Sequence, residues 1–166
     1  MSFTTSILFL FLTTLGTLIT LSSSSWLMIW IGMELNALAL FPLMAHADTP
    51  LAKKTALKYF TIQTTTAIVM LIGVLMLPQT INQSSPDCLT HNIALMMIMF
   101  GLTTKLALVP AHTWLLEIIR GQSRLMIMIL TTWQKLAPLW VFIKLAPSFP
   151  TLTWILAEKL TMWHKN

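Results

Sequence analysis

The sequence predicts an all-α membrane protein, a polytopic bundle of about six transmembrane helices with one broken helix. Of 166 residues, 56% are apolar and only 9% are charged, and the mean hydropathy is +0.78, so the chain lacks the polar surface of a soluble domain. Apolar runs of about 20 residues recur, whereas the alternating segments of about 10 residues that form outer-membrane barrels are not visible. The basic residues form no dense run, which argues against nucleic acid as a partner.

Hydrophobic runs separated by turn residues define one transmembrane domain over residues 1–166. The first run has no basic segment before it and reads as a retained span, with a cleaved signal peptide ending near the serines at 22–25 as the alternative. The last run is short and weak. The expected spans are about 3–21, 25–45, 56–78, 92–119, 123–145 and 149–163.

Threading these spans alternately across the membrane separates the basic residues by side. Only Lys144 lies towards the side opposite the N-terminus. Glu117 is expected at the basic boundary, either solvated or paired with Arg120. Because positive charge concentrates on the inner side of membranes, the N-terminus should face the cytoplasm or the mitochondrial matrix. The residues on the N-terminal side are Lys53, Lys54, Lys58, Arg120, Arg124, Lys159 and Lys165.

The run at 92–119 is too long to be one straight helix across a membrane. At about 1.5 Å per residue it would extend roughly 42 Å, against a hydrocarbon core of about 30 Å. Pro110 lacks a backbone donor and disfavours helical geometry at Val109, so we expect a break just after Lys105. Broken helices of this kind build ion sites in transporters, because their free backbone groups need a polar cavity.

Three ionisable residues, Glu34, Lys105 and Lys135, lie near the middle of their spans. One buried charge could be an isolated feature, but a carboxylate and two amines at a common depth form a candidate proton relay. A buried amine is penalised by desolvation, and a nearby carboxylate offsets that penalty. His112, just past the expected break, is either a further proton carrier or a hydrogen-bonded capping residue. Glu34 and Lys105 could alternatively form only an ion pair that fixes helix register.

The remaining unusual residues predict no metal or cofactor site in this chain. Cys88 is the single cysteine, and the four histidines are too far apart in sequence to suggest a local metal site.

Pro138 is expected to kink the fifth span and leave a carbonyl free. Gly32 and Gly101, each near a midplane charge, either allow close helix approach or relieve crowding.

Four segments occur in the order and spacing of a known family. They are WIGMELN from residue 30, AKKTALKYF from residue 52, KLALVPAHTW from residue 105 and WQKLAP from residue 133. Over about residues 15–145 the chain resembles the subunit 2 family of mitochondrial NADH-ubiquinone oxidoreductase, respiratory complex I. These are antiporter-like subunits of the membrane arm of that enzyme.

The resemblance implies a core subunit of an H⁺-translocating NADH:ubiquinone reductase, a multi-pass protein of the mitochondrial inner membrane with its N-terminus on the matrix side. Electron transfer would occur in other subunits, which hold NADH, flavin, iron–sulfur clusters and ubiquinone, while this chain holds none. The partners would be other membrane-arm subunits, in an obligate hetero-oligomer, and membrane lipids. By motif, Glu34 resembles the glutamate that modulates the channel lysine, Lys105 that lysine, and Lys135 the connecting lysine.

The sequence departs from the family after about residue 145. Family members continue with a second inverted half, whereas this chain ends at Asn166, and residues 146–166 match that continuation poorly. The chain is therefore expected to be shortened at its C-terminus, with the remaining half supplied by another chain, lost, or absent from this sequence. Two other functions stay open: a component of a cation/proton antiporter, and a purely structural membrane-arm subunit whose proton path has been lost.

Overall fold

Every regular element in the part of the chain that the structure describes is helical, which confirms the expected fold class. The structure is a computed structural model that describes residues 3–46, 49–77, 88–108 and 112–148. The elements are α1 (Phe3–Ser22), α2 (Trp26–Ala45), α3 (Pro50–Met76), α4 (Cys88–Leu106), α5 (Thr113–Ile119), α6 (Arg124–Met128), the π-helical turn η1 (Ile129–Trp133), α7 (Gln134–Leu145) and the 3₁₀ turn η2 (Ala146–Ser148).

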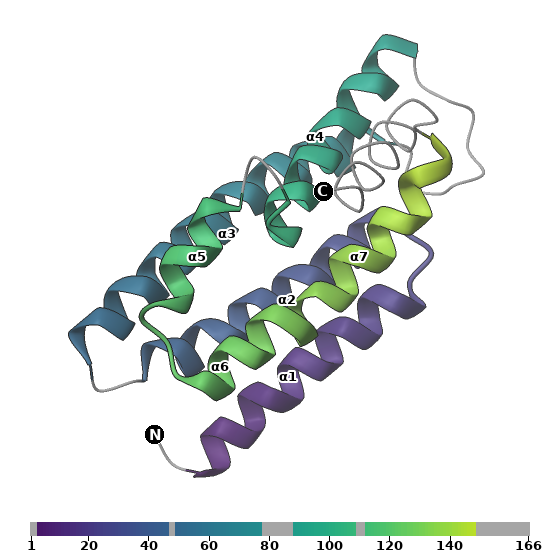
Figure 1. Cartoon of the computed structure of the whole chain (residues 1–166). Coiled ribbons are helices and arrows are strands. Elements are labelled where there is room, and N and C mark those ends of the chain that lie inside the picture. The colour runs from purple at the N-terminus through teal and green to yellow at the C-terminus, as the bar shows by residue number, and fades with distance from the viewer. Residues whose placement is uncertain (1–2, 47–48, 78–87, 109–111, 149–166) are drawn as a thin grey trace, which may run out of the picture.

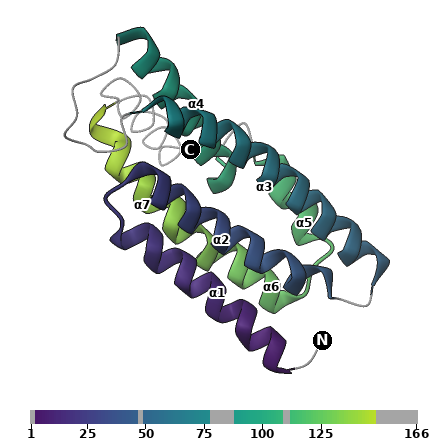
Figure 2. The ribbon, with the colours of Figure 1, turned by 180° about the vertical axis from the view of Figure 1, so that it is seen from behind.

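The helices form an elongated bundle (Figures 1 and 2). α1, α2 and α3 run side by side in that order, and α4 and α5 follow successive parts of α3. α6, η1 and α7 continue as one irregular helix that packs against α1, α2 and α4. Among the described residues, α1, α2, α3 and the segment Arg124–Leu145 are long and apolar enough to cross a membrane, so the chain is a multi-pass membrane protein. The expected span at 149–163 lies outside the described residues.

α3 begins six residues before the start expected at residue 56. The side-chain oxygen of Thr49 accepts a hydrogen bond from the backbone N–H of Ala52, and Pro50 occupies the first helical position, where its missing N–H has no cost. The helix start is thus set by capping chemistry. The expected span at 56–78 followed hydropathy, which excluded Lys53 and Lys54, whereas the helix itself extends further towards the N-terminus.

α1 and α2 approach each other closely through glycine. A Cβ atom on Gly32 would meet the Thr20 hydroxyl at 2.5 Å and the carbonyl of Gly16 at 2.8 Å, so no larger residue fits there. Helices in membranes associate largely by such close packing. Of the two interpretations of Gly32, close helix approach is the one that the structure supports.

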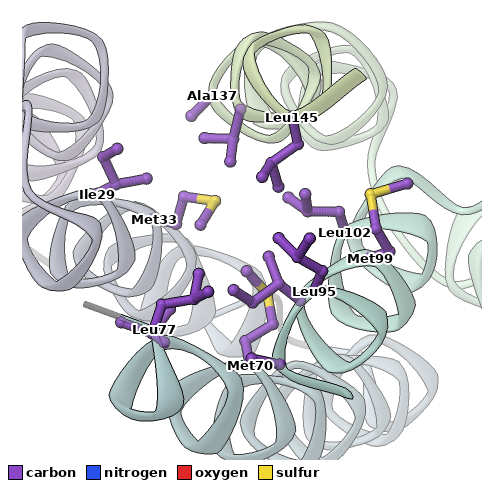
Figure 3. Close-up of a cluster of buried hydrophobic side chains, with 13 residues drawn as sticks. Ile29, Met33, Met70, Leu77, Leu95, Met99, Leu102, Ala137 and Leu145 are labelled. Atoms are coloured by element: carbon purple, nitrogen blue, oxygen red, sulfur yellow. The ribbon is translucent and has the colours of Figure 1, made fainter. Parts of the chain in front are cut away.

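Two apolar clusters occupy the interior of the bundle. Figure 3 shows the first, in which Met33 of α2, Met70 of α3, Leu102 of α4 and Ala137 of α7 meet, together with their neighbours. The second lies between α2, α3, α5 and η1, around Leu40, Met44, Ala56, Tyr59, Trp114, Ile118 and Leu130. On both α2 and α3 the two clusters lie towards different ends of the helix. Between them, at mid-span, lies a layer of polar side chains, here called the polar layer, which consists of Glu34, Asn36, Gln63, Lys105, Gln134 and Lys135.

Candidate functional site

The broken helix ends in a specific backbone turn. Ala107 adopts a left-handed conformation with φ 55°, and its N–H donates to the carbonyl of Thr104, while the N–H of Leu108 donates to that of Thr103. This is the Schellman pattern, which usually has glycine in place of Ala107. The break falls just after Lys105, as expected, and the position of Pro110 lies outside the described residues. The turn leaves the carbonyl of Lys105 free for another donor.

The amine of Lys105 is buried inside the polar layer. Its Nζ lies 2.7 Å from Oε1 of Glu34 on α2, and both side chains are almost fully shielded, with 4% and 11% of their surface exposed. The same Nζ donates a hydrogen bond of 3.1 Å to the side-chain oxygen of Gln63 on α3. α2, α3 and α4 therefore meet around one ammonium group.

Lys135 reaches the same place from α7. Its Nζ donates a hydrogen bond of 2.9 Å to the backbone carbonyl of Lys105, the group that the turn leaves free. It also lies 5.4 Å from the centre of the Trp114 ring, within the range of a cation–π contact. A cation at the C-terminal end of α4 is further favoured by the negative end of the helix dipole. Lys135 thus points into the bundle, which disfavours snorkelling of its amine to the membrane interface.

An irregular turn precedes α7, which runs past the polar layer. In η1 the N–H of Gln134 donates to the carbonyl of Ile129, five residues back, which is the π-helical pattern. Pro138 has no N–H to donate to the carbonyl of Gln134, as expected for a proline inside a helix. π turns inside helices are frequent at functional sites. The irregular geometry lies directly next to Lys135 and upstream of the proline.

Trp114 closes the site from α5. Its indole N–H donates to the carbonyl of Thr104 at 3.1 Å, and its ring lies 6.3 Å from that of Tyr59 on α3. α5 thus contacts the last turn of α4 through this indole. The contact covers one backbone carbonyl beside the break, as backbone at membrane depth requires.

A pair of amides ties α7 to α2 beside the charges. The side-chain N–H₂ of Gln134 donates to Oδ1 of Asn36 at 2.8 Å. Asn36 is 2% exposed and lies two residues after Glu34. Buried amides need such partners, because an unpaired one costs about 1–3 kcal/mol. The pair fixes the rotation of α7 immediately before Lys135.

A cavity of about 20 Å³ lies between the two lysines. Its walls include Gln63, Lys105, Gln134 and Lys135, with Tyr59 and Trp114 beside them. A space of about 10–15 Å³ is the minimum that holds one water molecule. The cavity is therefore water-sized and polar.

The other ionisable residues singled out from the sequence lie apart from this contact network. His112 is at the N-cap position of α5 but its side chain makes no capping bond, and its buried Nδ1 has no hydrogen-bond partner among the described residues. Glu117 is more than half exposed and pairs with Lys58 of α3, which agrees with the solvated alternative and replaces Arg120 as its partner. The described residues contain no group of three or more His, Cys, Asp or Glu side chains that could hold a metal ion.

The structure brings Glu34, Lys105 and Lys135 together, although sequence reasoning gave only their depth. It also adds residues that this reasoning missed, namely Asn36, Tyr59, Gln63 and Gln134. Their signal was present in the sequence but weaker than that of the charges, because an uncharged polar side chain inside a span also needs a partner, at a lower cost when it lacks one. A search for buried amides as well as charges would have found three of the four.

Comparison with known proteins places this site in a family. The profile of the family described as "NADH:quinone oxidoreductase/Mrp antiporter, TM" matches residues 23–162. The chain belongs to this family. The matched range contains every residue of the polar layer, from Glu34 on α2 to Lys135 on α7.

Several relatives are similar to this protein over most of the length of the chain. The chain is 40% identical over 148 residues to NADH-ubiquinone oxidoreductase chain 2 of Tetraodon nigroviridis, 39% over 134 residues to that of Didelphis virginiana and 34% over 144 residues to that of Ornithorhynchus anatinus. These alignments cover 89%, 81% and 87% of the chain. They cover only 42%, 39% and 42% of the relatives, so the chain spans about two fifths of their length.

A solved structure shows the same fold. A chain of respiratory complex I from Thermus thermophilus, determined with bound aureothin, superposes with a TM-score of 0.73 at 23% sequence identity. The likeness covers 81% of this chain and 32% of that one. The helical arrangement over the matched part of the chain is thus already known for a protein of that complex.

Proposed function

We propose that the chain is a core membrane-arm subunit of respiratory complex I that contributes to proton translocation coupled to electron transfer from NADH to ubiquinone. The observation that carries the proposal is the buried amine of Lys105, held 2.7 Å from Glu34 at the end of a broken helix, with the amine of Lys135 on its own carbonyl. Family membership and the names of the relatives support it. Charges are placed at such cost inside membranes mainly where they act.

The proposed mechanism is a charge relay. The carboxylate of Glu34 stabilises the charged amine of Lys105, and when the two groups separate, burial penalises that charge. The proton can then leave towards Lys135 across the water-sized cavity that both lysines line. The relay needs no redox chemistry in this chain, so electron transfer from NADH through flavin and iron–sulfur clusters to ubiquinone is assigned to other subunits.

The proposed setting is the mitochondrial inner membrane, with other membrane-arm subunits and lipids as partners. In the described part of the chain, Lys53, Lys54, Lys58, Arg120 and Arg124 belong to the bundle end where α3 begins and α5 ends, the end that also holds the start of α1. Lys144 lies at the opposite end, where its Nζ is 3.5 Å from the carbonyl of Ser23. By the positive-inside rule, the basic end, and with it the N-terminus, faces the matrix.

Proton pumping by the assembled complex tests this function. We expect Lys105→Met to reduce the number of protons translocated per NADH oxidised, because methionine keeps the length of the side chain and removes its charge. The measurement is proton uptake by inner-membrane vesicles, normalised to the amount of assembled complex. Lys53→Met, the same change at an exposed position, is the matched control and should pump normally. Unchanged stoichiometry in Lys105→Met would contradict the proposal.

A second function, component of a cation/proton antiporter, is favoured by the family description, which includes Mrp antiporters. Electrogenic exchange of sodium for protons in membranes without any NADH dehydrogenase would support it over the first. A third function, a purely structural membrane-arm subunit, has a different signature. It predicts normal pumping when Glu34, Lys105 and Lys135 are all neutralised in a complex that still assembles.

A further inference from the structure

The amine of Lys105 lies between two acceptors of different chemistry. Oε1 of Glu34 makes a close charge contact with Nζ, at 2.7 Å, but this oxygen has no partner in hydrogen-bond geometry among the described residues. The directed hydrogen bond of the amine goes to Oε1 of Gln63, at 3.1 Å. Gln63 is 7% exposed, so no bulk solvent competes for this bond. The carboxylate of Glu34 therefore stabilises the amine through its charge, whereas the amide of Gln63 orients the amine through a hydrogen bond.

Of the two acceptors, only Gln63 is among the described residues that line the cavity. Gln63 lines the water-sized cavity together with Lys105 and Lys135, whereas Glu34 is not among the described residues that line it. An amine held by Gln63 therefore lies at the wall that Lys135 shares. The carboxylate of Glu34, by contrast, holds the amine from outside the cavity lining.

We propose that Gln63 is a positioning residue, a neutral seat that holds the charged amine of Lys105 at the cavity, on the Lys135 side, when its pair with Glu34 opens. This inference rests on the proposed function and names a residue that the relay of charged groups does not include. Without such a seat, an amine released by the carboxylate would be a buried charge with no acceptor, which is strongly unfavourable. The seat lowers the cost of separating the pair.

The chemistry of an amide suits this role. Its oxygen accepts a hydrogen bond from an ammonium group, yet it carries no net charge at any physiological pH. It can therefore hold the amine during transfer without trapping it as a second carboxylate would. Tyr59, one turn earlier on the same helix, also lines the cavity, and Trp114 packs beside it, which keeps this wall rigid.

Substitution of Gln63 in the assembled complex tests the seat. A hydrogen bond to a charged group is strong enough that its loss weakens the state it holds about tenfold. Gln63→Leu should therefore slow proton translocation about tenfold, and Gln63→Met, with an unbranched side chain, should do the same if the leucine variant assembles poorly. Thr66→Val is the matched control, because within the described residues that buried hydroxyl bonds to the carbonyl of Ile62 in its own helix and to no other helix. It should pump normally.

An exchange of the two acceptors separates a seat from a merely structural amide. Glu34→Gln combined with Gln63→Glu keeps one carboxylate and one amide around Lys105 but moves the charge to the cavity side. Glu34→Gln alone is the reference, because it removes the relay carboxylate and leaves the amide in place. The seat predicts that the double variant assembles and pumps more slowly than Glu34→Gln alone, because the amine is now trapped at the cavity. A structural role for the amide predicts that the double variant pumps no more slowly than Glu34→Gln alone.

The outcomes of these measurements are distinguishable from those of the parent proposal. If Lys105→Met pumps normally, the proposed function fails, and the seat fails with it. If Lys105→Met does not pump but Gln63→Leu and Gln63→Met do so at the normal rate, only the seat is wrong. Normal pumping by the exchanged pair likewise overturns the seat and leaves the charge relay intact.

Discussion

Lys105 and Lys135 are the same residue type in one site, but their surroundings give them different tasks. The amine of Lys105 contacts a carboxylate and an amide, while that of Lys135 contacts a backbone carbonyl and the face of Trp114. A carbonyl and an indole ring attract a cation more weakly than a carboxylate does. The charge of Lys105 is therefore held by an anion, whereas the charge of Lys135 is held by neutral groups alone.

Replacement of Lys135 by methionine should affect both pumping and stability. The change removes the donor to the carbonyl of Lys105, and a buried carbonyl without a partner costs about 1–3 kcal/mol. We expect a lower thermal midpoint of the detergent-solubilised complex and at least a tenfold loss of proton translocation. Lys135→Arg, which keeps a donor and a charge, should recover the midpoint. A midpoint in Lys135→Met equal to that of the unmodified complex would contradict the role of this hydrogen bond.

At the residue scale, the sequence predicted the charged members of the site and not its amides. Glu34, Lys105 and Lys135 stand out because a charge inside a membrane is costly on any scale. Gln63 and Asn36 did not, since an amide in an apolar run gives a weaker signal and its partner lies on another helix. Lateral distance is the information that a sequence lacks.

Close packing of α1 against α2 should depend on glycine more than on hydrophobicity. Gly32→Ala places a Cβ atom 2.5 Å from the Thr20 hydroxyl, so the helices must separate or the threonine must turn away. Overpacking of this kind costs about 1–3 kcal/mol. The expected result is a lower midpoint in thermal unfolding of the solubilised complex. Leu18→Ala, on the exposed face of α1, serves as the control and should leave the midpoint nearly unchanged.

At the element scale, helix positions followed from hydropathy, while their ends followed from local chemistry that hydropathy does not contain. The Thr49 cap sets the start of α3, and the left-handed turn at Ala107 ends α4. The sequence correctly indicated a break after Lys105, but it gave no sign that alanine would occupy a position where glycine is usual. That turn is held by its hydrogen bonds and by the contacts of α5.

The end of α5 and the turn that follows it contact α3 through polar interactions of unequal strength. Gln122 donates to the carbonyl of Ala52 at 3.0 Å and to the hydroxyl of Thr55 at 2.9 Å in a partly buried setting. The pair of Lys58 and Glu117 is exposed, with 43% and 55% of the side chains accessible. Exposed ion pairs contribute about 0–1 kcal/mol, whereas an unpaired buried group costs about 1–3 kcal/mol.

Separate loss of these two contacts should therefore have unequal effects. We expect Gln122→Leu to make the segment around α5 more accessible to protease or hydrogen exchange, and Lys58→Ala to change it little. Hydrogen exchange of the segment Thr113–Ile119, measured by mass spectrometry in the solubilised complex, distinguishes the two variants. Equal protection in Gln122→Leu and the unmodified chain would mean that α5 is held by its apolar face alone.

At the scale of the molecule, composition was enough to predict a helical membrane bundle, because so apolar a chain has few alternatives. It could not predict that the bundle has a layered interior, with apolar clusters on both sides of a polar centre. That layering arises from how α2 and α3 are rotated against each other and against α4. The rotation of each helix about its axis is set by side-chain packing against neighbouring helices. The sequence shows the side chains of each helix, but it does not show which helix they pack against.

The small size of the space between the two lysines bears on energy conservation. A membrane that stores energy as a proton gradient conserves that energy only if protons do not return through it passively. A continuous column of water through this point would permit such a leak. The cavity of about 20 Å³ has room for about one water molecule and no column, and apolar clusters lie on both sides of it along the described helices. For the proposed relay, this means that a continuous water path at this point requires the described helices to move apart.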